Sequence, residues 1–221
     1  MSYQAAVFDM DGLLLDTERV CMQAFREACK VLALPMLEDV YLGIIGCNAE
    51  GIERVIRTGY GIDLNYQQLR NEWVKRYHPI IEQQAIPKKE GVMELLNWLK
   101  AQKIPIAVAT SSHKKQAVAK LRLAGLTDYV DSLSTGCEVS NGKPDPEIFL
   151  LAAQRLQTPP ERCLAFEDSS NGVRAAIAAG MQVHQVPDLV TPNDDIIALG
   201  HSISGSLADV LNDLKALKLK K

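Results

Sequence analysis

The chain has 221 residues and a formal net charge of −3; 47% of its residues are hydrophobic and 23% are charged. This length suits one large domain or two small ones, and this composition argues against disorder over most of the chain. The slightly acidic balance argues against a nucleic-acid surface, which needs clustered Lys and Arg, and no apolar run approaches the roughly 20 residues of a membrane helix. No signal peptide is visible, and the five cysteines are dispersed without a CxxC pair, so we expect reduced thiols in a cytoplasmic protein.

The first predicted strand is the apolar run at residues 5–8, and two carboxylates, Asp9 and Asp11, follow it. A short run of this kind is typical of a strand that is buried on both faces of a parallel sheet. Ligands of open α/β sheets bind at the carboxyl ends of the strands, where these two acids lie. Two neighbouring carboxylates repel each other unless a cation or a shared proton intervenes. We therefore expect a metal, a proton shuttle, or both at this position.

A helical region follows, in which apolar residues recur at four-residue intervals between Val20 and Leu32. Further helical patterns continue to about residue 86, with no convincing buried strand among them. We therefore predict that residues 16–86 form an all-helical domain, which is joined to the rest of the chain by linkers near residues 15–17 and 85–88.

From residue 87 onward, strand and helix patterns alternate. The predicted strands cover residues 104–109, 131–134, 163–166 and 181–186, and a closing helix covers residues 207–219. Alternation of this kind implies right-handed crossovers and a parallel sheet. We predict an α/β fold in which residues 1–15 and 87–221 form a discontinuous core and the helical domain is inserted after the first strand.

Two segments after the helical region carry groups that suit a phosphate. Thr110, Ser111 and Ser112 directly follow a predicted strand; hydroxyls and exposed amides at a helix start can hold a phosphate, although an ordinary helix cap uses the same residues. Lys143 lies in the stiff turn Gly-Lys-Pro-Asp-Pro, where a fixed positive charge could stabilise a transferring phosphoryl group, although most lysines only solvate a surface.

An acidic pair, Glu167 and Asp168, follows the strand predicted at residues 163–166 and opens a helix. Such a pair can cap a helix, or it can bind Mg²⁺, which takes one or two carboxylates together with water and substrate phosphate. The histidines show no metal-ligand spacing, so we do not expect zinc.

Four segments, in this order, resemble the motifs of the haloacid dehalogenase superfamily of phosphatases and phosphomutases. They are Asp-x-Asp-Gly-x-Leu-x-Asp-Thr from Asp9, the strand closed by Thr110, Lys-Pro-x-Pro-x-x-Phe from Lys143, and Glu-Asp-Ser-Ser-Asn-Gly from Glu167. The fourth segment is similar to that of the β-phosphoglucomutase-like branch. The resemblance implies a Rossmann-like three-layer core, a helical cap, Mg²⁺ dependence and an aspartyl-phosphate intermediate.

The resemblance also implies a role for each matching residue. Asp9 would be the nucleophile and Asp11 the general acid and base. The phosphoryl group would be held by Thr110, the Ser111 amide and Lys143. The residues implied at the metal are Asp9, the backbone carbonyl of Asp11, Asp168, and Glu167 either directly or through water.

The residues of the helical domain distinguish a phosphatase from a mutase. β-Phosphoglucomutase carries a histidine where we align Cys21 and a cap arginine just past a glycine that we align with Gly46, where this chain has no cation. The Cys21 thiol and the neutral amide of Asn48 would bind a doubly phosphorylated intermediate poorly. We therefore expect a Mg²⁺-dependent phosphatase of small phosphate monoesters such as sugar phosphates, with a sugar phosphomutase and a non-catalytic phosphate-binding module as alternatives.

The partner is expected to be a small phosphorylated metabolite, with no role for nucleic acid or membrane. We expect a monomer because no long apolar face is left unassigned. The selection of the substrate is left open; the candidate cap residues are Asn48, Glu50, Arg54, Lys75 and Arg76.

Overall fold

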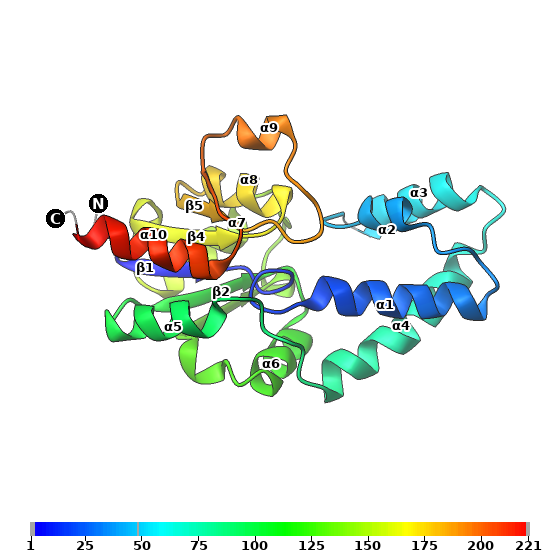
Figure 1. Cartoon of the computed structure of the whole chain (residues 1–221), viewed down its shortest axis with the longest axis horizontal. Helices are drawn as coiled ribbons and strands as arrows, with labels where there is room; N and C mark the ends of the chain where they lie inside the picture. Colours follow the sequence, from blue (N-terminus) through cyan, green and yellow to red (C-terminus); the bar gives the residue numbers. More distant parts are fainter. Residues whose placement is uncertain (1–2, 48, 220–221) are drawn as a thin grey trace.

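The computed structural model describes residues 3–47 and 49–219, which form a parallel β-sheet between two layers of helices, with further helices beyond the edge at which β1 ends (Figure 1). The strands lie in the order β3-β2-β1-β4-β5-β6, which is the order of doubly wound Rossmann folds. Their bounds are β1 Ala5–Phe8, β2 Ile106–Thr110, β3 Ser132–Thr135, β4 Cys163–Glu167, β5 Gln182–Gln185 and β6 Ser202–Ile203. The α/β fold with its parallel sheet and inserted helices is confirmed.

The register of the central strand β1 with its neighbours β2 and β4 brings the carboxyl ends of the three strands together. All four of its residues are buried, because helices cover both faces of the sheet. Phe8 lies opposite Val108 of β2 and opposite Phe166 of β4, and the rings of Phe8 and Phe166 stack with centroids 4.4 Å apart. The residues that follow β1, β2 and β4 therefore meet at one edge of the sheet, where the order of the strands reverses.

The two helical layers pack on different surfaces. One layer consists of α5 (Val92–Ala101), α6 (Lys114–Leu123) and α10 (Leu207–Leu219), and it packs on large side chains such as Phe8 and Phe166. The other consists of α7 (Glu147–Arg155), α8 (Ser170–Ala178) and α9 (Asp194–Ile197), and it packs on small ones such as Ala107 and Ala165. The short 3₁₀ turns are η1 Thr127–Tyr129, η2 Gly136–Glu138 and η3 Pro160–Arg162. Each fully buried large apolar side chain contributes about 1.5–3 kcal/mol to this core.

The inserted helices have an apolar core of their own. They are α1 (Thr17–Val31), α2 (Glu38–Leu42), α3 (Ala49–Tyr60) and α4 (Tyr66–Gln83), and they lie to the right of the sheet in Figure 1. The ring of Phe25 lies 5.3 Å from that of Tyr41 and 5.0 Å from that of Trp73. The Trp73 indole also donates to the Cys21 carbonyl at 3.1 Å, which ties α4 to α1. We refer to α1–α4 as the cap.

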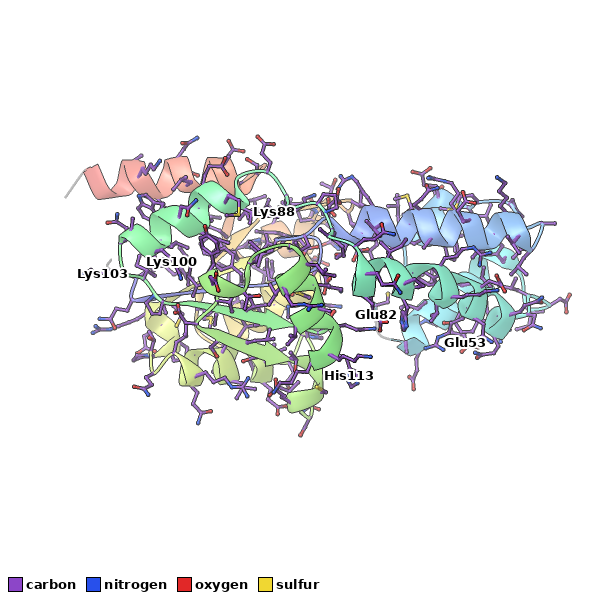
Figure 2. The ribbon with its side chains drawn as sticks, turned by 90° about the horizontal axis from the view of Figure 1, so that it is seen from below. Glu53, Glu82, Lys88, Lys100, Lys103 and His113 are labelled. Carbon is purple, nitrogen blue, oxygen red and sulfur yellow. The ribbon has the colours of Figure 1, made fainter. Side chains whose placement is uncertain are left out.

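The two segments that join the cap to the sheet lie side by side. Leu15 and Lys88 form an isolated antiparallel bridge, and the Asp16 amide donates to the Pro87 carbonyl at 2.9 Å. Figure 2 shows Lys88 at this junction, and Glu82 near the end of α4. The division of the chain at residues 15/16 and 86/87 stays a prediction.

The structure adds local details that the sequence did not indicate. The helix α7 begins at Glu147, and Asp145 Oδ1 accepts from the Glu147 amide at 3.0 Å. The strand β6 and the helix α9 were not predicted, because each is very short and β6 is exposed at the edge of the sheet. All five cysteines are free thiols. Within the described ranges, no helix combines the length and apolarity that would let it cross a bilayer.

Candidate active site

The structure brings the predicted site residues together at the carboxyl edge of the sheet. Asp9 and Asp11 follow β1, Thr110 ends β2, Glu167 ends β4 with Asp168 next to it, and Lys143 reaches this edge from the loop before α7. Ser111 is the first residue after β2 and is exposed. The roles of these residues stay predictions.

Lys143 connects two of the strands. Its Nζ lies 2.5 Å from Asp9 Oδ1 and 2.6 Å from Glu167 Oε1, and it donates to the Ala109 carbonyl at 3.1 Å. Its side chain is only 7% exposed and its ammonium lies 5.0 Å from the centre of the Phe149 ring. Burial alone would lower the pKa of Lys143, but the two carboxylates raise it above its usual value and so favour its charged form.

The loop that carries Lys143 is fixed by the helix that follows it. The Glu147 carboxylate accepts from the Ser140 amide at 2.9 and 3.0 Å and from the Asn141 amide at 2.9 Å. A carboxylate in the first turn of a helix is also favoured by the helix dipole. The first turn of α7 therefore holds the loop from which Lys143 enters the site.

Glu167 is fully buried and both of its oxygens are engaged. Oε1 accepts from Lys143, while Oε2 accepts from the Asp168 amide, the Ser169 amide and the Ser169 hydroxyl, each at 3.0 Å. A Cβ at Gly172 would lie 1.8 Å from Oε1, so only glycine leaves room for this carboxylate. These contacts argue against direct coordination of a metal by Glu167 and favour the alternative in which it acts through water.

The second aspartate faces a different lysine. Asp11 Oδ1 lies 2.6 Å from Lys120 Nζ, and Oδ2 accepts from the Ser112 hydroxyl at 2.7 Å and from the Thr110 hydroxyl at 3.2 Å. Lys120 also donates to the Ser112 hydroxyl at 3.1 Å and is only 3% exposed. Burial would raise the pKa of Asp11, but the Lys120 charge and the hydrogen bonds from Lys120 and Ser112 lower it below its usual value.

The sequence reasoning missed Lys120, although a signal was present. Ala117, Leu121 and Ala124 form the buried face of α6 and its end, and Lys120 lies among them at helical spacing. A lysine in an apolar helical stripe has to find a buried partner. This pattern predicts that Lys120 is buried and paired, but it does not identify the residue with which Lys120 pairs.

A buried carboxylate also lies next to Asp9. A Cβ at Gly12, which has a φ of +89°, would lie 2.5 Å from Asp168 Oδ2, so the turn after β1 holds this carboxylate closely. No group in the described ranges donates a hydrogen bond to the Asp168 carboxylate, and burial, followed by the charges of Glu167 and Asp9, raises its pKa well above the usual value. Burial likewise raises the pKa of Asp9 in spite of Lys143.

These two carboxylates fit a cation. Within residues 3–47 and 49–219, no group of three or more His, Cys, Asp or Glu side chains is arranged to hold a metal ion. Mg²⁺ does not need such a group, because it binds through one or two carboxylates and completes its shell with carbonyl, water and phosphate oxygens. Asp9 and Asp168, with the Asp11 carbonyl, could hold it in this way, and its charge would relieve their mutual repulsion.

The cap meets the site near the start of α1. Burial, followed by the charges of Asp11 and Asp188, raises the pKa of Glu18 to about 7. Burial and the charge of Glu18 raise the pKa of Cys21 to about 12, so this thiol is neutral at physiological pH. On the other side of the site, the Asn171 amide of α8 donates to the Gly46 carbonyl of the cap at 2.6 Å.

Within the described residues, four of the five cap candidates form no contact with the site residues. Lys75 and Arg76 both form ion pairs with Glu72 on their own helix, at 3.7 and 2.5 Å. Glu50 and Arg54 are exposed on α3. Asn48 lies outside the described residues.

Known proteins resemble this chain over most of its length. A family model described as haloacid dehalogenase-like hydrolase matches residues 3–180. A phosphorylated carbohydrates phosphatase of Thermotoga maritima is 33% identical over 217 residues, which cover 96% of this chain and 98% of the relative. A protein of Drosophila melanogaster named "Probable pseudouridine-5'-phosphatase" is 37% identical over 188 residues, which cover 82% of this chain and 80% of the relative.

Among solved structures, a variant of CbbY from Rhodobacter sphaeroides in complex with xylulose-(1,5)bisphosphate matches with a TM-score of 0.74 and 28% identity, covering 93% of this chain and 95% of that one. The match with the Thermotoga phosphatase spans both the core and the cap. The chain therefore belongs to the haloacid dehalogenase-like hydrolase family, in its β-phosphoglucomutase-like and CbbY subfamily with a helical cap.

Proposed function

We propose that this protein is a Mg²⁺-dependent phosphatase that hydrolyses small phosphate monoesters, sugar phosphates foremost, through an aspartyl-phosphate on Asp9. The observation that carries the proposal is the position of the Asp9 carboxylate at the end of β1, 2.5 Å from the buried Lys143 ammonium and beside the Asp168 carboxylate, which accepts no hydrogen bond from the described residues. The names of the relatives, which refer to phosphorylated carbohydrates and to pseudouridine 5'-phosphate, support the substrate class.

In the first step, Asp9 attacks the phosphorus, and the bond between phosphorus and the leaving oxygen breaks as the leaving oxygen takes a proton from Asp11. Asp11 has to take up that proton from solvent beforehand, because Lys120 and Ser112 favour its ionised form. The negative charge that spreads over the phosphoryl oxygens is balanced by Lys143. The Thr110 hydroxyl and the Ser111 amide would hold the same oxygens. Mg²⁺, held by Asp9 and Asp168, would add positive charge and keep the nucleophile and phosphate from repelling each other.

In the second step, water attacks the aspartyl-phosphate and Asp11 takes the proton from it. Asp9 is then regenerated and inorganic phosphate leaves. Water is the expected acceptor because the chain offers no cation at the two positions that we align with the mutase residues: Cys21 is a neutral thiol, and residues 47–49, which follow Gly46, include no Lys or Arg.

The test is phosphate release from a panel of small phosphate monoesters, with Mg²⁺ and with EDTA, beside an isomerisation assay with β-glucose 1-phosphate. We expect release that needs Mg²⁺, no isomerisation, and complete loss of release in the Asp9→Asn variant with an unchanged circular dichroism spectrum. Isomerisation without release would show that the protein is a mutase. Release at the wild-type rate by Asp9→Asn would overturn the nucleophile assignment.

A further inference from the structure

Lys120 is a second buried lysine of the site, and neither the motifs nor the proposed reaction assigns it a function. It reaches the site from the middle of α6, where its neighbours on the buried face are Ala117 and Leu121. An apolar side chain at this position would pack without any need for a partner, whereas a buried ammonium is costly unless it is paired. Asp11 is the one carboxylate in the described ranges that forms an ion pair with Lys120.

The contacts of Lys120 and Ser112 converge on one carboxylate. Lys120 lies 2.6 Å from Asp11 Oδ1, Ser112 donates to Asp11 Oδ2 at 2.7 Å, and Lys120 donates to the Ser112 hydroxyl at 3.1 Å. The three side chains form a closed ring of hydrogen bonds. Since Lys120 and Ser112 belong to α6 and to the loop that enters it, this ring ties the turn after β1 to a rigid helix.

We propose that Lys120 and Ser112 are positioning residues that hold the Asp11 carboxylate in the orientation that both of its proton transfers require. A general acid or base works only within hydrogen-bond distance of the reacting oxygen. The side chain of Asp11 stands on an irregular turn and is 23% exposed, so its orientation depends on the donors that hold it. The assignment rests on the proposed function, and it predicts which steps of that reaction fail when the ring is opened.

The two steps differ in their need for Asp11. Formation of the aspartyl-phosphate from p-nitrophenyl phosphate needs no proton donor, because nitrophenolate leaves as an anion. The same step with an alkyl phosphate needs a proton from Asp11, because an alkoxide is a poor leaving group. Hydrolysis of the aspartyl-phosphate needs Asp11 as a base with either substrate.

The experiment is stopped-flow kinetics of the Lys120→Met variant with p-nitrophenyl phosphate, beside steady-state turnover of a sugar phosphate. We expect an undiminished burst rate of nitrophenolate, a slower steady state after the burst, and a sugar phosphate turnover that falls roughly 10- to 100-fold, within the range of general acid–base effects. Ser112→Ala should show the same pattern with smaller changes, and Lys120→Arg, which keeps the charge, should be closer to wild type.

The matched control is Lys115→Met on the same helix, since the Lys115 side chain is 88% exposed; it should leave both phases unchanged. A second control is the double variant Lys120→Met with Asp11→Asn. If Lys120 acts through Asp11 alone, the double variant turns over at the rate of Asp11→Asn, because the effects of residues in one network do not add.

Equal loss of the burst and of the steady state in Lys120→Met, or a further loss in the double variant, would overturn the proposal and show that Lys120 supports the site as a whole. If Lys120→Met does not fold, the burst and the steady state of Ser112→Ala are compared in the same way: a kept burst with a slower steady state supports the proposal, and an equal loss of both overturns it. No turnover by the wild-type protein with any substrate would overturn the proposed function, and the assignment of Lys120 with it.

Discussion

Two buried lysines divide the site into two halves. Lys143, which is 7% exposed, lies against Asp9, and Lys120, which is 3% exposed, lies against Asp11. Lys143 is shared between two carboxylates, since Glu167 lies 2.6 Å from it on the other side. Lys120 contacts one carboxylate and one hydroxyl. The two aspartates are only two residues apart in the sequence, but their surroundings are not equivalent.

The difference sets the two carboxylates apart electrostatically. Burial, together with the charges of Glu167 and Asp11, raises the pKa of Asp9 in spite of Lys143. In contrast, Lys120 and Ser112 lower the pKa of Asp11 despite burial. Environments that separate two neighbouring acids are typical of sites in which the acids have different roles. The half around Asp9 has an excess of negative charge that a cation could balance. The half around Asp11 is already balanced by the protein itself.

The largest expected effect in this comparison comes from Lys143→Met. Removal of the ammonium leaves Asp9 and Glu167 buried without a counter-charge, which should lower the free energy of unfolding by about 3–5 kcal/mol. Turnover should fall by roughly 10²–10³-fold or more, because a fixed charge at the phosphoryl group is lost. Urea denaturation and the nitrophenolate burst measure the two effects.

Lys120→Met provides the contrast, because it should keep the burst that Lys143→Met loses. If the two variants lost the burst equally, the two halves would not have separate roles. The exposed Lys115→Met again serves as the control for a lysine lost from the surface.

A smaller effect on stability is expected in the half of the site around Asp9, where negative charge is in excess, when Mg²⁺ is added or removed. Asp168→Asn removes a buried carboxylate that is repelled by Glu167 and Asp9, so the metal-free protein should become more stable by about 1–2 kcal/mol. Mg²⁺ should raise the melting temperature of the wild-type protein in a concentration-dependent way, and this increase should be lost in the variant. Thermal denaturation with Mg²⁺ and with EDTA measures both effects.

The matched control for this experiment is Asp63→Asn, which changes an exposed carboxylate outside the site. A melting temperature of the wild-type protein that does not change with Mg²⁺ concentration would contradict the predicted metal position.

The smallest effect is expected at Glu18, which lies on the side of Asp11 and whose pKa is raised from 4.5 to about 7. Between these two values the folded state binds more protons than the unfolded state, so the free energy of unfolding falls as the pH rises from about 4.5 to about 7. Glu18→Gln should remove this fall, making the metal-free variant about 1 kcal/mol more stable than wild type at pH 8 and no more stable at pH 4. Urea denaturation at the two pH values checks the sign, and a parallel decline in both proteins would contradict it.

The sequence alone determined much of the fold and one half of the site. Short apolar runs such as residues 5–8 mark strands, because a strand in a parallel sheet is buried on both faces. The carboxyl ends of such strands are where ligands bind, so Asp9, Thr110 and Asp168 could be placed at one edge. Lys143 could be found because it lies in a stiff turn of a recognisable motif.

The other half of the site was decided by the tertiary structure. Lys120 carries no local signal beyond its place in an apolar helical stripe, and its partner Asp11 lies 109 residues away in the sequence. Their contact depends on the pairing of β1 with β2 and on the position of α6 against the sheet. The contact of Glu167 Oε1 with Lys143 and the pairing of Leu15 with Lys88 have the same origin. Local patterns report burial and turns, which are properties of a segment, whereas the distance between two charges on different segments exists only once the whole sheet and its helices have packed.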